Sequence, residues 1–419
     1  MERTILHCDC NGFFASVECL LHPELKKVPM AVCGSPEERH GIILAKNERA
    51  KKYGVQTAET IWQAKRKCPK LVLVPPHHGE YRKYSALVNR IYREYTDQVE
   101  PFGIDESWLD VTGSRLLFGD GEYIANEIRE RVKAEIGITI SAGVSFNKIF
   151  AKLGSDYKKP DAVTAISREN YKNIAWPLPV ENLLYVGPAT TRKLNDLGIH
   201  TIGELANTPL DCLHRRFGKW GDMLFCFANG NDITPVAAYD KAQIIKSVGN
   251  STTTIRDLTT DEDVKMVLFV LAESVGRRMR EQGFKGRTLT VWVRDNKLFS
   301  ISRQCKFLKY TNISSEIAAK AMWLFRRVYS WYSPIRSIGI SVSDFAPDSV
   351  PTQIDLYGSE QQRIRLERLD GAVDVLKRRF GSYCVQRASL LSEPALTRFS
   401  PKEENIIHPV GYFKGGEQV

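Results

Sequence analysis

A short apolar strand near the N-terminus ends in an acidic residue. Residues 4–9 (TILHCD) have the composition of a buried strand that ends at Asp9. Residues 99–111 (VEPFGIDESWLDV) alternate as a β-hairpin does, and the turn contains Asp105 and Glu106. The first 165 residues follow the order strand, helix, hairpin, helix, strand. This order predicts an α+β fold with an antiparallel sheet and helices on one face.

The three acids predict a metal site if they meet at one edge of this sheet. Carboxylates at close range repel one another and raise each other's pKa, so they need a cation to stay ionised. Hard divalent ions, chiefly Mg²⁺, prefer oxygen ligands. Two such ions about 3.5–4 Å apart can bind both the attacking and the leaving oxygen of a phosphoryl-group transfer. One strand-end acid alone is more often a turn or cap residue, so the prediction depends on all three together.

The positive charge of the chain is concentrated in one segment. The 419 residues suggest two to four domains and carry a net charge of +10. Residues 241–345 contain 18 Lys and Arg against 9 Asp and Glu, so nearly all of the excess lies there. A solvated basic face would give the same count. Clustering of this size in one domain nevertheless favours a protein that binds a phosphate backbone.

Several classes of protein do not fit the sequence. No apolar run approaches the roughly 20 residues of a membrane span, and the N-terminus lacks the layout of a secretory signal. We therefore expect a cytosolic protein without a membrane segment. The nine cysteines include no CxxC pair, and the eight histidines show no metal-ligand spacing. His77 and His78 are interpreted as part of a solvated loop.

Two later segments have patterns typical of DNA-binding units. Residues 186–205 (VGPATTRKLNDLGIHTIGEL) have the outline of a helix-hairpin-helix, in which turn amides face a phosphate. An ordinary helical hairpin is equally consistent with these residues. Residues 241–345 predict a βαββαβ domain whose four-stranded sheet has one polar, cationic face. A charged helix over 361–380 follows, with apolar residues at helical spacing, and disorder is expected from about Ser392.

Four motifs resemble those of the Y-family DNA polymerases, above all the bacterial DNA polymerase IV (DinB-type) branch. They are ILHCDCNGFFASVE, GIDESWLDVTG, GVSFNKIFAKLGSDYKKP and the hairpin VGPATTRKLNDLGIHTIGEL, and they occur in the family's order. The resemblance implies a multidomain right hand. Its parts would be a palm (1–19 and 78–165), small fingers (20–77), a helix-hairpin-helix thumb (166–235), a βαββαβ little finger (241–345) and a C-terminal tail (346–419).

The resemblance also implies an activity. It indicates a template-directed DNA polymerase that adds dNMPs to a primer 3′-hydroxyl by two-metal nucleotidyl transfer. Synthesis would have low fidelity, would pass DNA lesions and would lack proofreading, since no further block of acidic motifs remains for an exonuclease. The implied partners are primer–template DNA, dNTPs and two Mg²⁺ ions. The enzyme would be a monomer in the bacterial cytoplasm, associated with the nucleoid.

The resemblance assigns roles to individual residues. Asp9, Asp105 and Glu106 would be the catalytic metal ligands, with the backbone carbonyl of Cys10. Phe14 would be the steric gate that excludes a ribonucleotide 2′-hydroxyl, although the residues alone favour a core position in the first helix. The other implied contacts are Phe13, Phe14, Lys51 and Lys159 to the nucleotide, and Gly187, Arg294, Arg303 and Lys306 to DNA.

The chain departs from the family pattern at a few positions. Asn11 stands where the family usually has a second Asp, at a position that is not normally a metal ligand. Glu48 and Lys51 replace a Tyr and an Arg of the fingers, so Lys51 keeps a charge without the bidentate fork of arginine. Tyr185 replaces a customary Gly in the thumb hairpin. This last change weakens the expectation of tight phosphate contact there.

Residues 353–357 (QIDLY) resemble the peptide by which bacterial polymerases bind the sliding clamp. Gln353, Leu356 and Tyr357 supply the polar and apolar anchors expected of an extended peptide in a groove. A sliding clamp is therefore an expected partner.

Two alternatives remain at this point. A palm-fold nucleotidyl cyclase shares the paired acids of the hairpin but needs neither the thumb nor the basic domain. A non-catalytic DNA-binding accessory factor would fit Glu48 and Asn11, although all three acids are intact. DNA-dependent incorporation of dNTPs distinguishes all three possibilities.

Overall fold

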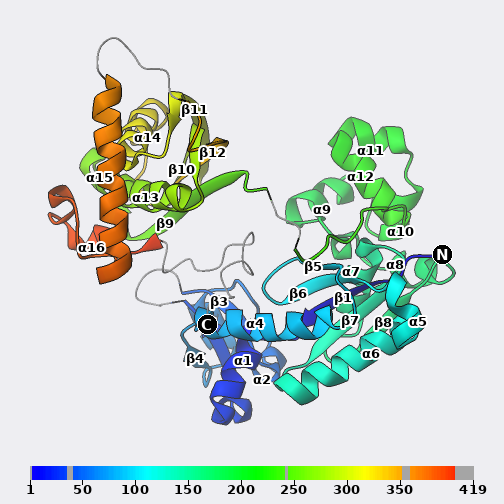
Figure 1. The fold of residues 1–419 in the computed structure, drawn as a ribbon. Coiled ribbons are helices and arrows are strands. Elements are labelled where there is room, and N and C mark those ends of the chain that lie inside the picture. The colour runs from blue at the N-terminus through cyan, green and yellow to red at the C-terminus, as the bar shows by residue number, and fades with distance from the viewer. Residues whose placement is uncertain (1, 35–40, 241–243, 352–358, 402–419) are drawn as a thin grey trace. The chain divides into compact units, whose positions relative to one another are not determined.

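The computed structural model describes residues 2–34, 41–240, 244–351 and 359–401 (Figure 1). The chain forms two compact units. The N-terminal unit contains residues 2–34 and 42–240, and the C-terminal unit begins after residue 243. The α+β class expected from the sequence is confirmed, since both units combine helices with β-sheets.

A five-stranded sheet of order β5-β6-β1-β7-β8 forms the centre of the N-terminal unit. Its central strand β1 pairs antiparallel with β6 and β7, and all six of its residues are buried. The pair β7–β8 is parallel, which corrects the prediction of a purely antiparallel sheet. Helix α7 connects these two strands, as parallel pairing requires. The strands are β1 (Ile5–Cys10), β5 (Val99–Pro101), β6 (Glu106–Asp110), β7 (Ile140–Ser145) and β8 (Val163–Ile166).

The longer helices within the first 165 residues are α1, α4, α6 and α7. Helix α7 packs very closely on β7, because a side chain at Gly143 would place its Cβ 1.9 Å from the carbonyl oxygen of Ala151. Glycine at this position therefore allows α7 to approach the sheet. The helices are α1 (Phe13–Leu21), α4 (His78–Arg93), α5 (Arg115–Phe118), α6 (Gly121–Arg131) and α7 (Lys148–Tyr157), with short turns η1 (Pro23–Lys27), η2 (Thr112–Ser114) and η3 (Val132–Ile136).

The segment expected to form the fingers has its own small sheet and core. The sheet order is β3-β2-β4, and buried residues such as Ile43, Ala50 and Leu71 form a separate cluster beside it. Asn47 caps α2, and Thr60 with Gln63 forms a capping box at α3. The elements are β2 (Met30–Cys33), β3 (Ile43–Lys46), α2 (Glu48–Lys52), α3 (Ile61–Lys67) and β4 (Val72–Val74).

Short helices form the segment expected to be the thumb. Helix α9 begins directly after Gly187, with Pro188 at its first position. Helix α10 begins with a capping box of Thr201 and Glu204. Tyr185 has a φ of 70°, the left-handed region that favours glycine. The elements are α8 (Tyr171–Ala175), η4 (Val180–Asn182), α9 (Pro188–Asn195), α10 (Ile202–Asn207), α11 (Leu210–Phe217) and α12 (Lys219–Ala228).

The C-terminal unit has the predicted βαββαβ order. Its four strands form an antiparallel sheet of order β11-β10-β12-β9. Helices α13 and α14 pack on one face, where residues such as Leu271, Val291 and Phe325 form the core. The elements are β9 (Ser247–Leu258), α13 (Asp261–Glu281), β10 (Phe284–Asp295), β11 (Ser300–Thr311), α14 (Ser314–Val328) and β12 (Ile335–Pro347).

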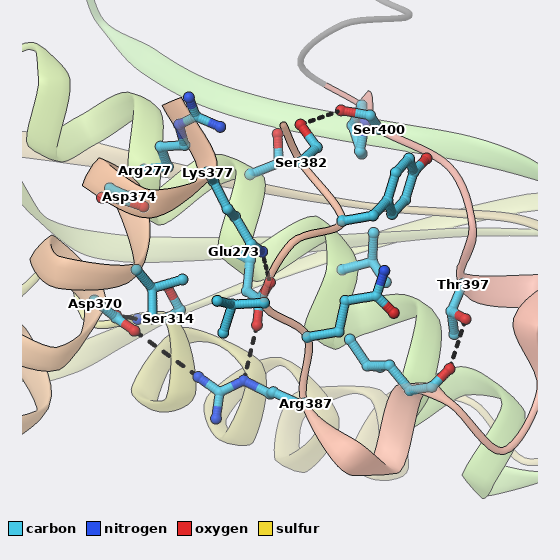
Figure 2. Close-up of a pocket in the computed structure, with 18 of the residues that line it drawn as sticks. Glu273, Arg277, Ser314, Asp370, Asp374, Lys377, Ser382, Arg387, Thr397 and Ser400 are labelled. Atoms are coloured by element: carbon cyan, nitrogen blue, oxygen red, sulfur yellow. Dashed lines mark hydrogen bonds and ion pairs between the residues drawn. The ribbon is translucent and has the colours of Figure 1, made fainter. Parts of the chain in front are cut away.

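The charged helix predicted over 361–380 is α15 (Ser359–Phe380). It contacts the C-terminal unit through its charged residues, while Leu369 and Phe380 are 55% and 62% exposed. A cavity of about 250 Å³ lies beside it, bordered by ion pairs that include Lys377–Glu273 and Arg387–Glu273 (Figure 2).

The expectation of disorder from about Ser392 is wrong for the described residues. Short helices η5 (Ala388–Leu390) and α16 (Pro394–Thr397) follow α15, and Leu396 is buried in the core of this unit. None of the helices in the described part of the chain combines the length and the apolar character that a bilayer-spanning helix needs.

Candidate active site

The three predicted acids lie on neighbouring strands at one end of the five-stranded sheet. Asp9 is directly opposite Glu106 in the β1–β6 pairing. The carbonyl oxygen of Asp105 accepts a hydrogen bond of 2.9 Å from the backbone N–H of Cys10, so the hairpin turn is held against the end of β1. Strand pairing therefore brings together acids that are far apart in the sequence.

The environment of each acid differs. Burial, together with the charges of Asp9 and Glu106, raises the pKa of Asp105 to about 6. Burial also opposes ionisation of Glu106, but the neighbouring His7 and the Lys152 ammonium group lower the pKa of this carboxyl to about 2. Asp105 therefore gains more from an added cation than Glu106 does.

Two lysine ammonium groups contact the acids. Lys152 Nζ lies 3.3 Å from Asp9 Oδ2 and also contacts Glu106. Lys159 Nζ lies 2.8 Å from the same Asp9 oxygen and 2.7 Å from Asp156 Oδ1. Burial alone would lower the pKa of Lys152, but the nearby carboxylates raise it, so the group stays charged. Lys152 reaches the acids because α7 packs closely on β7 at Gly143.

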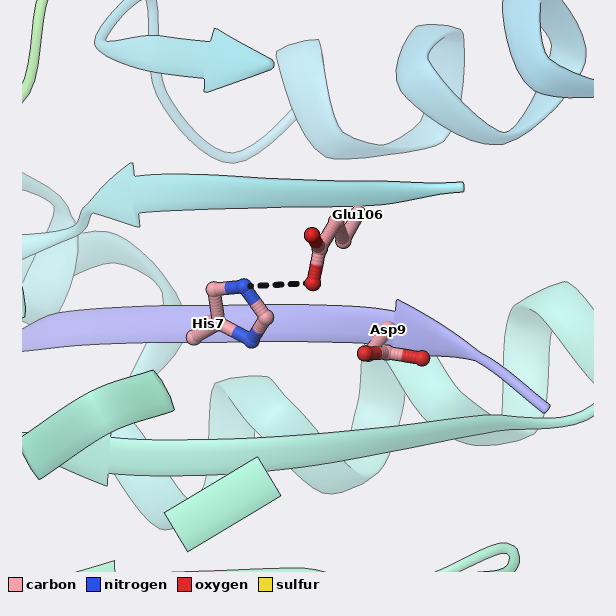
Figure 3. A group of neighbouring side chains, drawn as sticks. All are labelled: His7, Asp9 and Glu106. Carbon is pink, nitrogen blue, oxygen red and sulfur yellow. Dashed lines mark ion pairs between the residues drawn. The ribbon is translucent and has the colours of Figure 1, made fainter. Parts of the chain in front are cut away.

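His7 joins this cluster, although the sequence spacing gave no sign of it. It is fully buried on β1, and its Nε2 lies 3.4 Å from Glu106 Oε2 (Figure 3). Its Nδ1 lies 2.8 Å from Ser155 Oγ. Ligand atoms of His7, Asp9 and Glu106 all lie within 4.8 Å of one another. Only the fold, not the spacing of histidines, brings a histidine to the acids.

The donor set suits a hard divalent cation. Asp9, Asp105 and Glu106 offer carboxylate oxygens, and the side chain of Cys10 is buried. Burial raises the pKa of the Cys10 thiol well above its ordinary value, so the thiol stays protonated and does not offer a soft thiolate ligand. Oxygen ligands fit ions such as Mg²⁺ and Mn²⁺.

Two of the predicted nucleotide residues, Phe13 and Phe14, begin α1 shortly after Asp9. Gly12 has a φ of 53° and ends the strand before α1. Phe13 is buried, and Phe14 is half-buried with its ring stacked on Tyr81, the ring centroids being 4.1 Å apart. Lys51 is exposed and lies 3.5 Å from Glu48. Glu48 thus pairs with the lysine that was expected to contact the triphosphate.

Asn11 has a structural role at the position where the family pattern has Asp. Its Nδ2 donates to Ser141 Oγ at 2.9 Å, and its Oδ1 accepts from the backbone N–H of Asp161 at 2.9 Å. These bonds link the end of β1 to β7 and to the segment after α7. The side chain is therefore already engaged on both of its polar atoms.

The interpretation of His77 and His78 as a solvated loop holds for His77 and is wrong for His78. His77 precedes α4 and is exposed, although its Nδ1 lies 2.9 Å from Oε1 of the buried Glu18. His78 is the first residue of α4 and lies edge-on to Phe14, with ring centroids 5.9 Å apart. The two adjacent residues contact different partners because tertiary packing, which the local sequence does not reveal, brings α1 against α4.

The predicted DNA-binding residues do not all share one surface. In the strand register Lys306 lies opposite Thr288 and Arg294 opposite Ser300, on the face of the sheet away from α13 and α14. A groove of about 430 Å³ on this face is bordered by small residues and Trp292. Arg303 is opposite the buried Val291, so it lies on the helix-covered face.

Gly187 lies before the first turn of α9, and a Cβ there would meet nothing within 4 Å. Its approach to a phosphate is therefore not blocked by the protein itself. The expected clamp-binding residues Gln353, Leu356 and Tyr357 lie outside the described residues.

Three family models match the chain. Residues 8–156 match the impB/mucB/samB family, and residues 245–356 match the C-terminal domain of the same family. Residues 181–232 match the thumb domain of DNA polymerase-iota.

Curated relatives match nearly the whole chain. A DNA polymerase IV of Acetivibrio thermocellus is 53% identical over 398 residues, which is 95% of this chain and 100% of that protein. A DNA polymerase IV of Moorella thermoacetica is 39% identical and covers 93% of this chain and 97% of its own length. DNA polymerase IV 2 of Bacillus subtilis is 35% identical, with coverage of 93% and 95%.

A solved Y-family DNA polymerase chimera of Dbh and Dpo4 has the same fold. Its TM-score is 0.71 at 23% identity, over 82% of this chain and 99% of the chimera. The chain belongs to the impB/mucB/samB family of Y-family DNA polymerases, in which its relatives are DNA polymerase IV proteins.

Proposed function

We propose that this chain is a template-directed DNA polymerase that extends a primer 3′-hydroxyl and copies damaged templates with low fidelity. The observation that carries the proposal is the meeting of Asp9, Asp105 and Glu106 at one end of the sheet. Relatives named DNA polymerase IV that align over almost the full chain support it.

Asp9, Asp105 and Glu106, with the carbonyl of Cys10, would hold two Mg²⁺ ions. When bound, these ions activate the primer hydroxyl and stabilise the leaving pyrophosphate. The raised pKa of Asp105 supports a cation there, because a cation favours the ionised form of the acid. Lys159 contacts Asp9. If a metal bound Asp9, the ammonium group of Lys159 would be free to bind the triphosphate of the incoming nucleotide.

Phe14 would be the steric gate for the sugar, with Phe13 beside it. Phe14 is the second residue of α1, five residues after Asp9, and its ring is half-buried, which supports its position next to the nucleotide. Lys51 would contribute a weaker triphosphate contact, since Glu48 offsets its charge. A rigid aromatic ring excludes a 2′-hydroxyl by contact rather than by hydrogen bonding.

DNA would be held by the thumb and by the open face of the C-terminal sheet. Gly187 at the start of α9 would contact a phosphate through backbone amides, while Arg294 and Lys306 would contact the duplex backbone. The palm, fingers, thumb and little finger would follow the predicted boundaries. We further propose a monomeric enzyme, associated with the bacterial nucleoid in the cytoplasm, that binds a sliding clamp through Gln353, Leu356 and Tyr357.

Single-nucleotide insertion on defined templates tests the proposal. A labelled primer is paired with four templates that differ in the templating base and with a fifth that carries an abasic site, in Mg²⁺, Mn²⁺ or EDTA. We expect insertion to follow the templating base, to continue opposite the abasic site and to stop in EDTA. DNA binding without insertion would support an accessory factor, and a cyclic nucleotide product would support a cyclase.

A further inference from the structure

The buried Glu18 and Tyr81 and the exposed His77 form a hydrogen-bonded group behind the ring of Phe14. The ring stacks on that of Tyr81, with an interplanar angle of 11°. The Tyr81 hydroxyl donates a hydrogen bond to Oε1 of Glu18, and His77 Nδ1 lies 2.9 Å and 3.1 Å from the two carboxylate oxygens of Glu18. Glu18 and Tyr81 are both fully buried. The hydrogen-bonded group therefore extends from His77, at the start of α4, to the face of the Phe14 ring.

The ring stack and the hydrogen bonds both connect helix α1 with the start of helix α4. Phe14 and Glu18 are four residues apart on α1 and so lie on the same face of that helix. Tyr81 and His77 are likewise four residues apart at the start of α4. The stack and the hydrogen bonds therefore join the same two helical faces, one turn apart. A shift of either helix would disturb both at once.

Burial makes this arrangement costly to disturb. A carboxylate without water needs hydrogen-bond donors, and Glu18 receives them from Tyr81 and His77. Burial, reinforced by the bond to Glu18, raises the pKa of Tyr81, so its hydroxyl remains a donor. A tilt of the Tyr81 ring would deprive Glu18 of a donor. The ring on which Phe14 rests is consequently fixed in one orientation.

We infer that Glu18, Tyr81 and His77 are positioning residues that fix the ring of Phe14 and thereby set how strongly the site rejects ribonucleotides. The inference rests on the proposed role of Phe14 as the steric gate. A ring that can tilt makes room for one more oxygen atom, whereas a fixed ring does not. Discrimination is the ratio of kcat/KM for the two nucleotides. A looser ring raises kcat/KM for the ribonucleotide, which needs the extra room, and not for the deoxynucleotide.

The test compares insertion of a dNTP and the matching rNTP opposite the same template base. Tyr81→Phe keeps the aromatic stack and removes the donor to Glu18. We expect its dNTP-over-rNTP ratio of kcat/KM to fall about three- to tenfold, through faster rNTP insertion, with dNTP insertion within about twofold of wild type. Glu18→Gln keeps an acceptor for Tyr81, and its amide can donate to His77, so this variant should keep the wild-type ratio.

Two further variants complete the experiment. Tyr84→Phe removes a half-buried tyrosine hydroxyl from the same helix while leaving the Tyr81–Glu18 pair in place, and it should not change the ratio. Phe14→Ala tests the premise, and its ratio should fall further than that of Tyr81→Phe. An unchanged ratio in Phe14→Ala would overturn the steric gate itself. Loss of selectivity in Phe14→Ala but not in Tyr81→Phe would overturn only the positioning role, as would an equal loss of both activities in Tyr81→Phe.

Discussion

Two acids of the candidate active site, Asp105 and Glu106, have different electrostatic environments. Glu106 has both His7 and Lys152 beside it, whereas Asp105 is buried among like charges, and its pKa rises to about 6. Folding without a metal therefore forces Asp105 either to bind a proton or to remain as an unfavourable charge. This difference gives the cluster a measurable pH dependence.

Replacing Asp105 by Asn should stabilise the metal-free protein at neutral pH. The folded-state pKa of Asp105 lies above its ordinary value, so its contribution to stability is fully present below about pH 4 and is lost as the pH rises through about 6. Asn cannot ionise and avoids this loss. We expect the free energy of unfolding of Asp105→Asn to exceed that of wild type by on the order of 2 kcal/mol at pH 8. This gap in unfolding free energy should close towards pH 4.

Urea unfolding in EDTA at several pH values measures this gap. Adding Mg²⁺ at pH 8 should narrow it, because a bound cation favours the ionised acid. A gap that does not change with pH would show that Asp105 is not held in a destabilising environment.

The sequence predicted the acids of the site and Lys159 beside them, but not Lys152 or His7. Asp9, Asp105 and Glu106 are marked by strand ends and a hairpin turn, which are local patterns. Lys152 reaches them from a helix that packs closely only because residue 143 is glycine. That contact depends on tertiary packing, which no spacing within the sequence expresses.

Helix α15 also packs in a way that its sequence does not reveal. Its position is predicted from the spacing of apolar residues, yet Ile364, Leu369 and Phe380 are exposed. The helix instead contacts the C-terminal unit through ion pairs. Arg280 binds Asp374 at 2.7 Å and Asp370 at 3.2 Å, and all three side chains are nearly buried. Helical periodicity identifies a helix but not which of its faces packs.

Removing Arg280 should destabilise the docking of α15. Arg280→Ala leaves the carboxylates of Asp370 and Asp374 without their shared cation, at an expected cost of about 3 kcal/mol. Arg280→Met combined with Asp370→Asn and Asp374→Leu should recover much of this loss, because no unpaired charge remains. Urea unfolding gives the free energies of unfolding of these variants.

Arg378→Ala, at a side chain that is 66% exposed, is the matched control and should cost under about 0.5 kcal/mol. Equal costs for Arg280→Ala and Arg378→Ala would contradict this account of docking.

The excess positive charge of the protein lies mostly in one of its two compact units. Residues 241–345 hold nearly all of the excess positive charge, and the structure makes them most of a separate unit. The βαββαβ order is predicted because its strands and helices are long and regular. The orientation of single side chains on the edge strand β11 is not, since it depends on the strand register.

Charge removal on the two faces of β11 should have different effects on DNA binding. Lys306→Ala on the open face should lower affinity and reduce the slope of log affinity against log salt by about 1. Arg303→Ala removes the same charge from the helix-covered face of the same strand and should leave the slope unchanged. Fluorescence anisotropy of a labelled duplex across a salt series measures both. Equal slopes for the two variants would argue against the open face as the DNA surface.

The proposed function requires that the acids on β1 and the adjacent hairpin turn catalyse DNA synthesis. The most direct measurement is primer extension in Mg²⁺ by wild type and by Asp105→Ala/Glu106→Ala, with DNA affinity measured on the same samples. Glu122→Ala/Glu130→Ala, on exposed positions of α6, removes the same charge elsewhere. We predict that only the first variant loses extension while it still binds DNA. Extension by that variant at the wild-type rate would contradict the assignment of the active site.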